Sequence, residues 1–202
     1  MRRYDGSVES TSHEDQIRTV FLDRDGVINQ KMPEGRYVGT IRDFRILPGA
    51  AEAIGRLNRA GVRVIVVSNQ RGIALGLYTA EDVAAIQTFL QRALAEHTAQ
   101  IDRFFFCPHD RKACDCRKPR TGLYEQAVHD FPEITPATSV MIGDSLSDIE
   151  FGCRAGMRAI FIEGDPETRG PGAESAMRLA EFSAPSLSAA VDVLFRRNLI
   201  PQ

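Results

Sequence analysis

The sequence lacks the features that would place a protein in a membrane or on nucleic acid. No apolar run approaches the roughly 18 residues that a membrane-spanning helix requires, and the N-terminus turns polar and acidic at once, without a signal-peptide core. The formal net charge is only −2, so there is no electrostatic case for binding nucleic acid or an anionic membrane. We therefore expect a cytoplasmic protein with no membrane or nucleic-acid partner. Nothing in the sequence demands a dimer, and we expect a monomer.

Lysine and cysteine are both scarce, which makes each one informative. Among 25 basic residues only three are lysine: Lys31, Lys112 and Lys118. The chain has four cysteines, and three of them fall within ten residues of one another: Cys107, Cys114 and Cys116. A cytosolic cluster of this kind indicates a metal site more than disulfide bonds. Cys153 stands apart on a predicted helix, and we expect its side chain in the core.

The rest of the composition is ordinary for a globular protein, with 202 residues, 43% of them apolar and 26% charged. Residues 1–16 are polar and aperiodic, so we expect a flexible tail before a single domain over residues 17–202. Five apolar stretches have the pattern of buried strands, at about 19–23, 62–69, 101–107, 139–144 and 158–163. Helical patterns lie at about 48–61, 79–96, 121–129, 148–155, 173–182 and 186–197. This alternation predicts a doubly wound, mainly parallel α/β sheet.

Polar residues stand where several of these strands end. They are Asp23 with Asp25, Ser68 with Asn69, and Asp144. Because parallel strands present their carboxyl ends at one edge of a sheet, we expect these groups to meet there. Gly26 lets the chain turn sharply and brings backbone N–H groups close to a ligand. Three carboxylates at one edge repel each other without a cation, and their oxygens suit Mg²⁺. Each acid alone would also serve as a helix cap.

The cysteine cluster contains four ligands of the types that zinc prefers: Cys107, His109, Cys114 and Cys116. In an extended chain, residues two apart face the same way, so each pair is able to point at one ion. Two such pairs close a tetrahedron without an open position, which makes the zinc structural. The alternative is a set of buried cysteines with His109 on the surface. We call residues 108–119 the zinc loop, and Lys118 follows its last ligand closely.

Together these motifs resemble the haloacid dehalogenase superfamily of phosphatases, in order and spacing, from residue 20 to residue 148. Asp-Arg-Asp-Gly-Val resembles its first motif, Ser68-Asn69 the second, Lys118 the third, and Gly143-Asp144 with Asp148 the fourth. A narrower resemblance lies in Asp-Arg-Asp-Gly, Ser-Asn-Gln-Arg-Gly-Ile-Ala and Cys-Pro-His…Cys-Asp-Cys-Arg-Lys-Pro. These look like D-glycero-D-manno-heptose 1,7-bisphosphate phosphatases, whose near relatives are histidinol-phosphate phosphatases.

The resemblance implies a role for each residue at the strand ends. Asp23 would attack phosphorus and form an aspartyl phosphate, while Asp25 would protonate the leaving alkoxide and then deprotonate water. Mg²⁺ would be held by Asp23, the backbone carbonyl of Asp25, and Asp144. Ser68 and the backbone of Asn69 would hydrogen-bond the phosphoryl oxygens. Lys118 would add a positive charge there, unless it is an ordinary surface lysine.

The resemblance also points to the residues that would contact the rest of the substrate. Gln70 and Arg71 follow the second motif, where the family contacts sugar, and Gly26 of the first motif is a further substrate-binding candidate. Arg117 carries a fork-shaped guanidinium suited to a hydroxyl or a second phosphate. Arg36, Arg42 and Arg71 are further candidates, each with a plain surface role as the alternative. One helix, one strand and a loop fill each interval between the motifs, so no cap domain fits. We expect an open site covered only by residues 30–45, here called the roof loop, and the zinc loop.

The resemblance implies a Mg²⁺-dependent, zinc-stabilised phosphatase that removes the C7 phosphate of heptose 1,7-bisphosphate in nucleotide-activated heptose biosynthesis. The alternative is a histidinol-phosphate phosphatase or another small sugar or alcohol phosphate monoesterase. One departure bears on the substrate: Ser145 follows Asp144, where the heptose enzymes carry lysine. A phospho-acceptor signalling domain is disfavoured by Asp25, because a built-in acid/base hydrolyses an acyl phosphate. A zinc-stabilised module without catalysis is disfavoured because every key acid and Lys118 are present.

Overall fold

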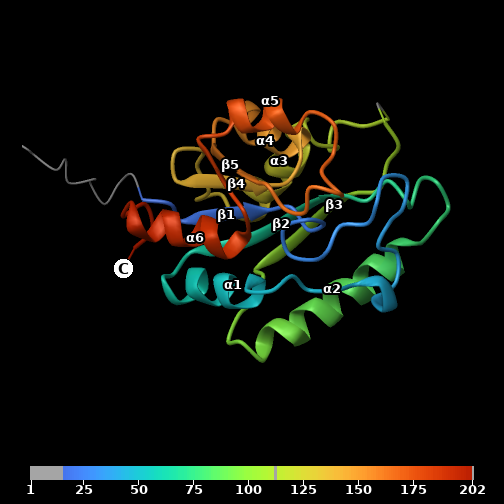
Figure 1. The fold of residues 1–202 in the computed structure, drawn as a ribbon, viewed down its shortest axis with the longest axis horizontal. Helices are drawn as coiled ribbons and strands as arrows, with labels where there is room; N and C mark the ends of the chain where they lie inside the picture. Colours follow the sequence, from blue (N-terminus) through green and yellow to red (C-terminus); the bar gives the residue numbers. More distant parts are fainter. Residues whose placement is uncertain (1–15, 112, 202) are drawn as a thin grey trace, which may run out of the picture.

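The computed structural model describes residues 16–111 and 113–201, and its centre is one sheet of six parallel strands. The strands lie in the order β3-β2-β1-β4-β5-β6 (Figure 1). Their bounds are Thr19–Leu22 (β1), Arg63–Asn69 (β2), Arg103–Cys107 (β3), Ser139–Gly143 (β4), Arg158–Ile162 (β5) and Phe182–Ala184 (β6). The tail predicted for residues 1–16 lies outside the described residues, apart from residue 16 itself. The predicted doubly wound α/β sheet is confirmed.

Helices cover both faces of this sheet, as Figure 1 shows. On one face lie α1 (Ala50–Arg59), α2 (Ala80–Ala95) and α6 (Leu187–Arg196), and on the other α3 (Gly122–Asp130), α4 (Leu146–Arg154) and α5 (Ala173–Leu179). A short 3-10 turn, η2 (Ile41–Asp43), lies in the roof loop. Within the described residues, none of these helices combines the length and apolarity needed to cross a bilayer.

The cores on the two faces of the sheet explain why strand β1 has a continuous apolar run from Val20 to Leu22. Val20 and Leu22 pack into the core below α1, α2 and α6, whereas Phe21 points to the core below α3 and α4. A strand buried on both faces needs a continuous apolar run, because its side chains alternate between the two faces. The N-terminus of α2 is fixed by a capping box between Thr79 and Asp82.

Two sequence predictions are wrong. The helix expected over residues 173–182 ends at Leu179, and Phe182–Ala184 forms the edge strand β6 beside β5. This strand was missed because Phe-Ser-Ala is too short to show a period. Cys153 is exposed rather than in the core. The buried side of α4 is occupied by Asp148, Ile149, Phe151 and Gly152, and the next residue turns outward.

Candidate active site

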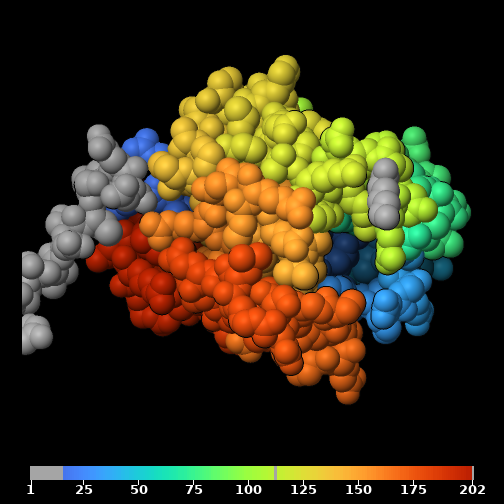
Figure 2. Space-filling view, turned by 90° about the horizontal axis from the view of Figure 1, so that it is seen from above, coloured from blue at the N-terminus to red at the C-terminus, as the bar shows by residue number. Residues whose placement is uncertain are grey.

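Strands β2, β1 and β4 are neighbours, so the polar residues at their carboxyl ends meet at one edge of the sheet. A cavity of about 290 Å³ opens there. Eight of the predicted site residues line it: Asp23, Asp25, Ser68, Asn69, Gln70, Arg117, Lys118 and Asp144. Figure 2 shows a hollow with a dark blue floor, framed by the roof loop, the zinc loop and the segment after β4. Gly26 lies in the wall of an adjoining cavity instead.

Three carboxylates converge on the floor of this cavity. One oxygen each of Asp23, Asp144 and Asp148 lies within 4.8 Å of the others. Burial raises the pKa of Asp23 to about 7 in spite of nearby Lys118, and burial likewise raises the pKa of Asp144 to about 6. A group of hard oxygen donors that ionises with difficulty is suited to a divalent cation, which removes the repulsion. The donor set therefore fits the Mg²⁺ that the sequence predicts.

Asp148 enters this group because the chain is very close-packed where β4 leads into α4. A Cβ added to Gly143 would lie 2.2 Å from the Cβ of Asp148, so only glycine leaves room for it. Asp148 also closes a capping box with Ser145 at the start of α4. The sequence placed Asp148 in the fourth motif without listing it among the metal ligands.

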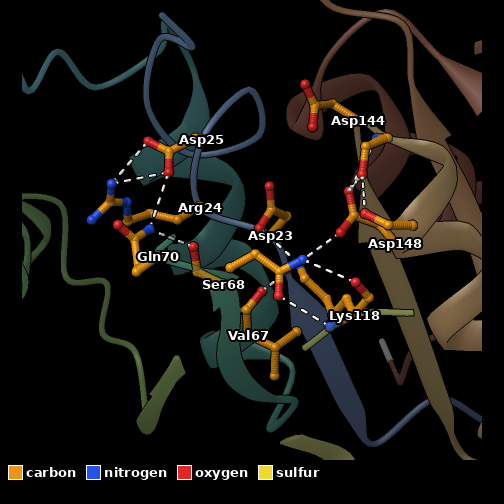
Figure 3. Close-up of polar contacts among 12 residues, drawn as sticks. Asp23, Arg24, Asp25, Val67, Ser68, Gln70, Lys118, Asp144 and Asp148 are labelled. Atoms are coloured by element: carbon orange, nitrogen blue, oxygen red, sulfur yellow. Dashed lines mark hydrogen bonds and ion pairs between the residues drawn. The ribbon is translucent and has the colours of Figure 1, made fainter. Parts of the chain in front are cut away.

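Lys118 is the cation of the cavity floor, and its side chain is 1% exposed. Its Nζ donates to Asp23 Oδ1 at 2.8 Å and to the carbonyl of Val67 at 2.7 Å, and it pairs with Asp148 Oδ1 at 2.6 Å (Figure 3). The alternative of a surface lysine is therefore wrong. The neighbouring carboxylates outweigh burial and raise the Lys118 pKa, so its charge is retained.

Asn69 holds the backbone of Lys118 in place. Its Nδ2 donates to the Lys118 carbonyl at 3.1 Å, and its Oδ1 accepts from the Lys118 amide at 3.0 Å. The zinc loop is thus joined to the end of β2 next to the catalytic floor. Sequence reasoning expected only the backbone of Asn69 to act, toward the substrate.

The side chain of Asp25 lies on the other side of Asp23 and is held by three donors (Figure 3). Arg24 Nη2 donates to both carboxylate oxygens at 2.9 and 3.0 Å, and Asn29 Nδ2 donates at 2.9 Å. Gln70 Nε2 lies 3.3 Å away and also donates to Ser68 Oγ at 2.7 Å. Gln70 is thereby oriented within the site rather than toward solvent.

The four predicted zinc ligands form one compact cluster. Cys107 Sγ lies 3.4 Å from Cys114 Sγ and 3.7 Å from His109 Nδ1. Cys116 Sγ lies 3.3 Å from both Cys114 Sγ and His109 Nδ1. Tetrahedral Zn²⁺ with bonds near its usual lengths spaces its ligand atoms by about 3.5–3.8 Å. The cluster therefore fits zinc, and the exposed ring of His109 still turns its Nδ1 toward the sulfurs.

The predicted arginine candidates separate into two groups. Arg117 lines the cavity, and its buried Nη1 has no hydrogen-bond partner among the described residues. Arg36 also lines the cavity. Arg71 instead pairs with Asp110 of the zinc loop at 2.5 Å, and Arg42 is exposed on η2.

Comparisons with known proteins agree with this geometry. Residues 115–190 match a family model described as HAD-hydrolase-like. A heptose-1,7-bisphosphate 7-phosphatase of Mycobacterium bovis is 46% identical over 132 residues, 65% of this chain and 69% of the relative. The Escherichia coli K12 enzyme of this type is 34% identical over 79% of this chain and 86% of its own. This chain belongs to the heptose-1,7-bisphosphate 7-phosphatase family of the haloacid dehalogenase superfamily.

A solved structure from the same family supports the assignment. The D,D-heptose 1,7-bisphosphate phosphatase of B. bronchiseptica, complexed with magnesium and phosphate, has a TM-score of 0.78 and 28% identity. The match covers 89% of this chain and 99% of that one. A metal and a phosphate are thus described together in a protein with the same fold.

The site of this phosphatase also contains residues that sequence reasoning missed. Arg24 is 2% exposed and holds Asp25, and Tyr78 donates from its hydroxyl to Gln70 Oε1 at 2.8 Å. Lys31 lines the cavity, and its Nζ lies 2.6 Å from Asp144 Oδ2. The scarcity of lysine was the signal for Lys31, and a charged residue inside a motif was the signal for Arg24. Nothing local marked Tyr78.

Proposed function

We propose that this chain removes the C7 phosphate of D-glycero-D-manno-heptose 1,7-bisphosphate as a Mg²⁺-dependent phosphoric monoester hydrolase. The proposal includes a cytoplasmic, monomeric enzyme that acts in nucleotide-activated heptose biosynthesis. One observation carries the choice of a bisphosphate. The cavity with Asp23 on its floor also contains Arg117, a guanidinium whose buried Nη1 lacks a partner among the described residues. A second phosphate would supply that partner.

In the proposed reaction, Asp23 attacks the phosphorus atom, and the bond to the sugar oxygen breaks. Asp25 gives its proton to the departing alkoxide, which leaves an aspartyl phosphate on Asp23. Asp25 then takes a proton from a water molecule as that water attacks phosphorus, and the Asp23 carboxylate is regenerated with release of phosphate. Ser68 and Lys118 bind the phosphoryl oxygens during both steps.

The metal ions have separate places in this proposal. Mg²⁺ would be held by Asp23, Asp144 and Asp148, with the backbone carbonyl of Asp25, and it would offset the repulsion between carboxylate and phosphate. Zn²⁺ would be held by the cluster of Cys107, His109, Cys114 and Cys116 in a structural role. Lys118 reaches Asp23 from the far end of the loop that this cluster ties together.

Histidinol phosphate is the second candidate substrate. Glu34 of the roof loop lines the cavity and would attract a cationic substrate. The two candidates differ in charge at the end remote from the scissile phosphate, where one has an anion and the other a cation. Arg117 favours the first, because its guanidinium repels a cationic group.

The test compares kcat/KM for both anomers of heptose 1,7-bisphosphate and for histidinol phosphate, with Mg²⁺ present. We expect the bisphosphate to be preferred, and Arg117→Met to lower kcat/KM for it by about 10–100-fold. The same variant should change turnover of a heptose 7-phosphate much less. Asp23→Asn should abolish turnover of every substrate. Equal loss with mono- and bisphosphate in Arg117→Met would contradict the role of Arg117, and a preference for histidinol phosphate would overturn the substrate.

A further inference from the structure

Lys31 stands where the catalytic cavity meets its neighbour. It follows the first motif and belongs to the roof loop, far from the fourth motif in sequence. Its Nζ nevertheless lies 2.6 Å from Asp144 Oδ2, and the side chains of the pair are 26% and 10% exposed. Lys31 and Asp144 both line the catalytic cavity and an adjoining cavity of about 400 Å³. An ammonium group therefore reaches the catalytic floor from its roof.

The two lysines at this floor are held very differently. Lys118 is 1% exposed and has three acceptors, which are Asp23, Asp148 and the Val67 carbonyl. Lys31 is a quarter exposed, and the acceptor that the structure gives its Nζ is Asp144. A long, partly exposed side chain with one ionic contact changes partners at lower cost than a buried one held by three acceptors. Lys31 is thus the movable cation of the pair.

Lys31 and a divalent cation compete for the carboxylate of Asp144. An ammonium at 2.6 Å occupies the same carboxylate that the metal group requires. When the carboxylate binds a doubly charged ion, the ammonium is repelled from it. The nearest new anion in the cavity is then a phosphoryl group bound over Asp23. Ser145 brings no charge to this place, and its hydroxyl already donates to Asp148 at 2.6 Å.

We propose that Lys31 is a phosphate-binding residue that pairs with Asp144 in the metal-free chain and moves to a phosphoryl oxygen when Asp144 binds the cation. This rests on the proposed function only in that the substrate is a phosphate ester. Lys31 then has two measurable effects of opposite sign. It competes with Mg²⁺ for Asp144 before substrate arrives, and it strengthens phosphate binding afterwards.

Calorimetric titration separates these effects without any substrate turnover. Wild type, Lys31→Met and Lys31→Arg are titrated first with Mg²⁺ alone and then, at saturating Mg²⁺, with inorganic phosphate. The matched control is Arg18→Met, which also removes one positive charge, from an exposed residue just before β1 at the opposite edge of the sheet. Circular dichroism verifies that each variant is folded.

In Lys31→Met we expect the Mg²⁺ dissociation constant to fall several-fold and the phosphate dissociation constant to rise about tenfold or more. Lys31→Arg should restore phosphate binding to within a few-fold, and Arg18→Met should match wild type. Unchanged phosphate affinity in Lys31→Met overturns the proposal, as does weaker Mg²⁺ binding. Because inorganic phosphate carries no sugar, either result stands whatever the natural substrate proves to be.

Discussion

Gly26 of the first motif lies directly against Asp144 of the fourth. Its φ is +95°, and an added Cβ would lie 2.2 Å from Asp144 Oδ2. The backbone here therefore needs both a left-handed conformation and the absence of a side chain. Any substituent would move the Asp144 carboxylate away from the other metal-binding acids. The glycine thus serves the metal group directly.

We predict that Gly26→Ala weakens Mg²⁺ binding by about tenfold or more and lowers the free energy of unfolding by about 2–3 kcal/mol. Gly61→Ala is the matched control, because Gly61 has φ +71° but no atom within 4 Å of its added Cβ. In Gly61→Ala the free energy of unfolding should fall by only about 1 kcal/mol, the cost of the backbone strain, and Mg²⁺ binding should be normal. Metal titration and urea unfolding measure both quantities. Equal Mg²⁺ affinity in the two variants would show that Gly26 acts through its backbone alone.

At the same scale, residue identity was predictable but side-chain direction was not. The strand-end pattern placed Asp23, Ser68 and Asp144 correctly at one cavity. The resemblance assigned the Asn69 backbone and Gln70 to the substrate, but it did not predict that the side chains of these residues hold Lys118 and Ser68. Where a polar side chain at a strand end points depends on partners that come from other elements, and a local pattern contains no information about them.

The zinc loop is the element that carries Lys118, to which we assign a role in phosphate binding. Its four ligand atoms gather at one point, and Lys118 follows Cys116 by two residues. Asn69 and the Arg71–Asp110 ion pair attach the loop to the end of β2 and the segment after it. A loop without regular structure needs such ties to present an ammonium group in one position.

We predict that Cys114→Ser reduces bound zinc to well below one ion per chain and lowers both the melting temperature and kcat, because Lys118 loses its support. Cys153→Ser is the control, since Cys153 is exposed on α4 and outside the cluster. It should retain zinc, stability and activity. Metal analysis, thermal unfolding and phosphate release provide the three readouts. If Cys114→Ser kept full zinc and a wild-type melting temperature, the cluster would not be a structural metal site.

Elements with a strong period were predictable, and short ones were not. The buried apolar run of β1 predicts a strand, and the spacing of the buried residues along α2 predicts a helix. Strand β6 has three residues and lies at the sheet edge beside β5, so its pairing and not its sequence makes it a strand. The tie between Arg71 and Asp110 joins two loops, and loops carry no period from which to infer contacts.

For the whole molecule, the strand order decides where the chemistry lies. The chain moves outward from β1 through β2 to β3 and then returns to β4 on the other side of β1. The loops after β1, β2 and β4 therefore diverge around one point, which is the usual place for a ligand in such sheets. Five acidic residues and two lysines line the cavity at this point. The stability of the whole chain is consequently linked to protons and Mg²⁺.

The direction of this linkage follows from the two perturbed acids. Burial raises the pKa of Asp23 to about 7 and that of Asp144 to about 6 in the metal-free fold. In the unfolded chain both titrate near their ordinary value of about 4. Between these limits the folded chain binds more protons, so its free energy of unfolding falls as pH rises from about 4 to about 7. We expect Mg²⁺ to bind the ionised acids, and therefore to stabilise the fold most above that range.

We therefore predict that Mg²⁺ raises the melting temperature little at pH 5 and by several degrees at pH 8. Thermal unfolding with and without Mg²⁺, at several pH values and with zinc retained, measures the difference. Asp23→Asn removes the acid with the higher pKa, so its metal-free stability should depend less on pH in this range. A Mg²⁺ effect of equal size at pH 5 and pH 8 would mean that the metal does not bind these ionised carboxylates. In that case the protons on Asp23 and Asp144 would not compete with Mg²⁺ for these carboxylates.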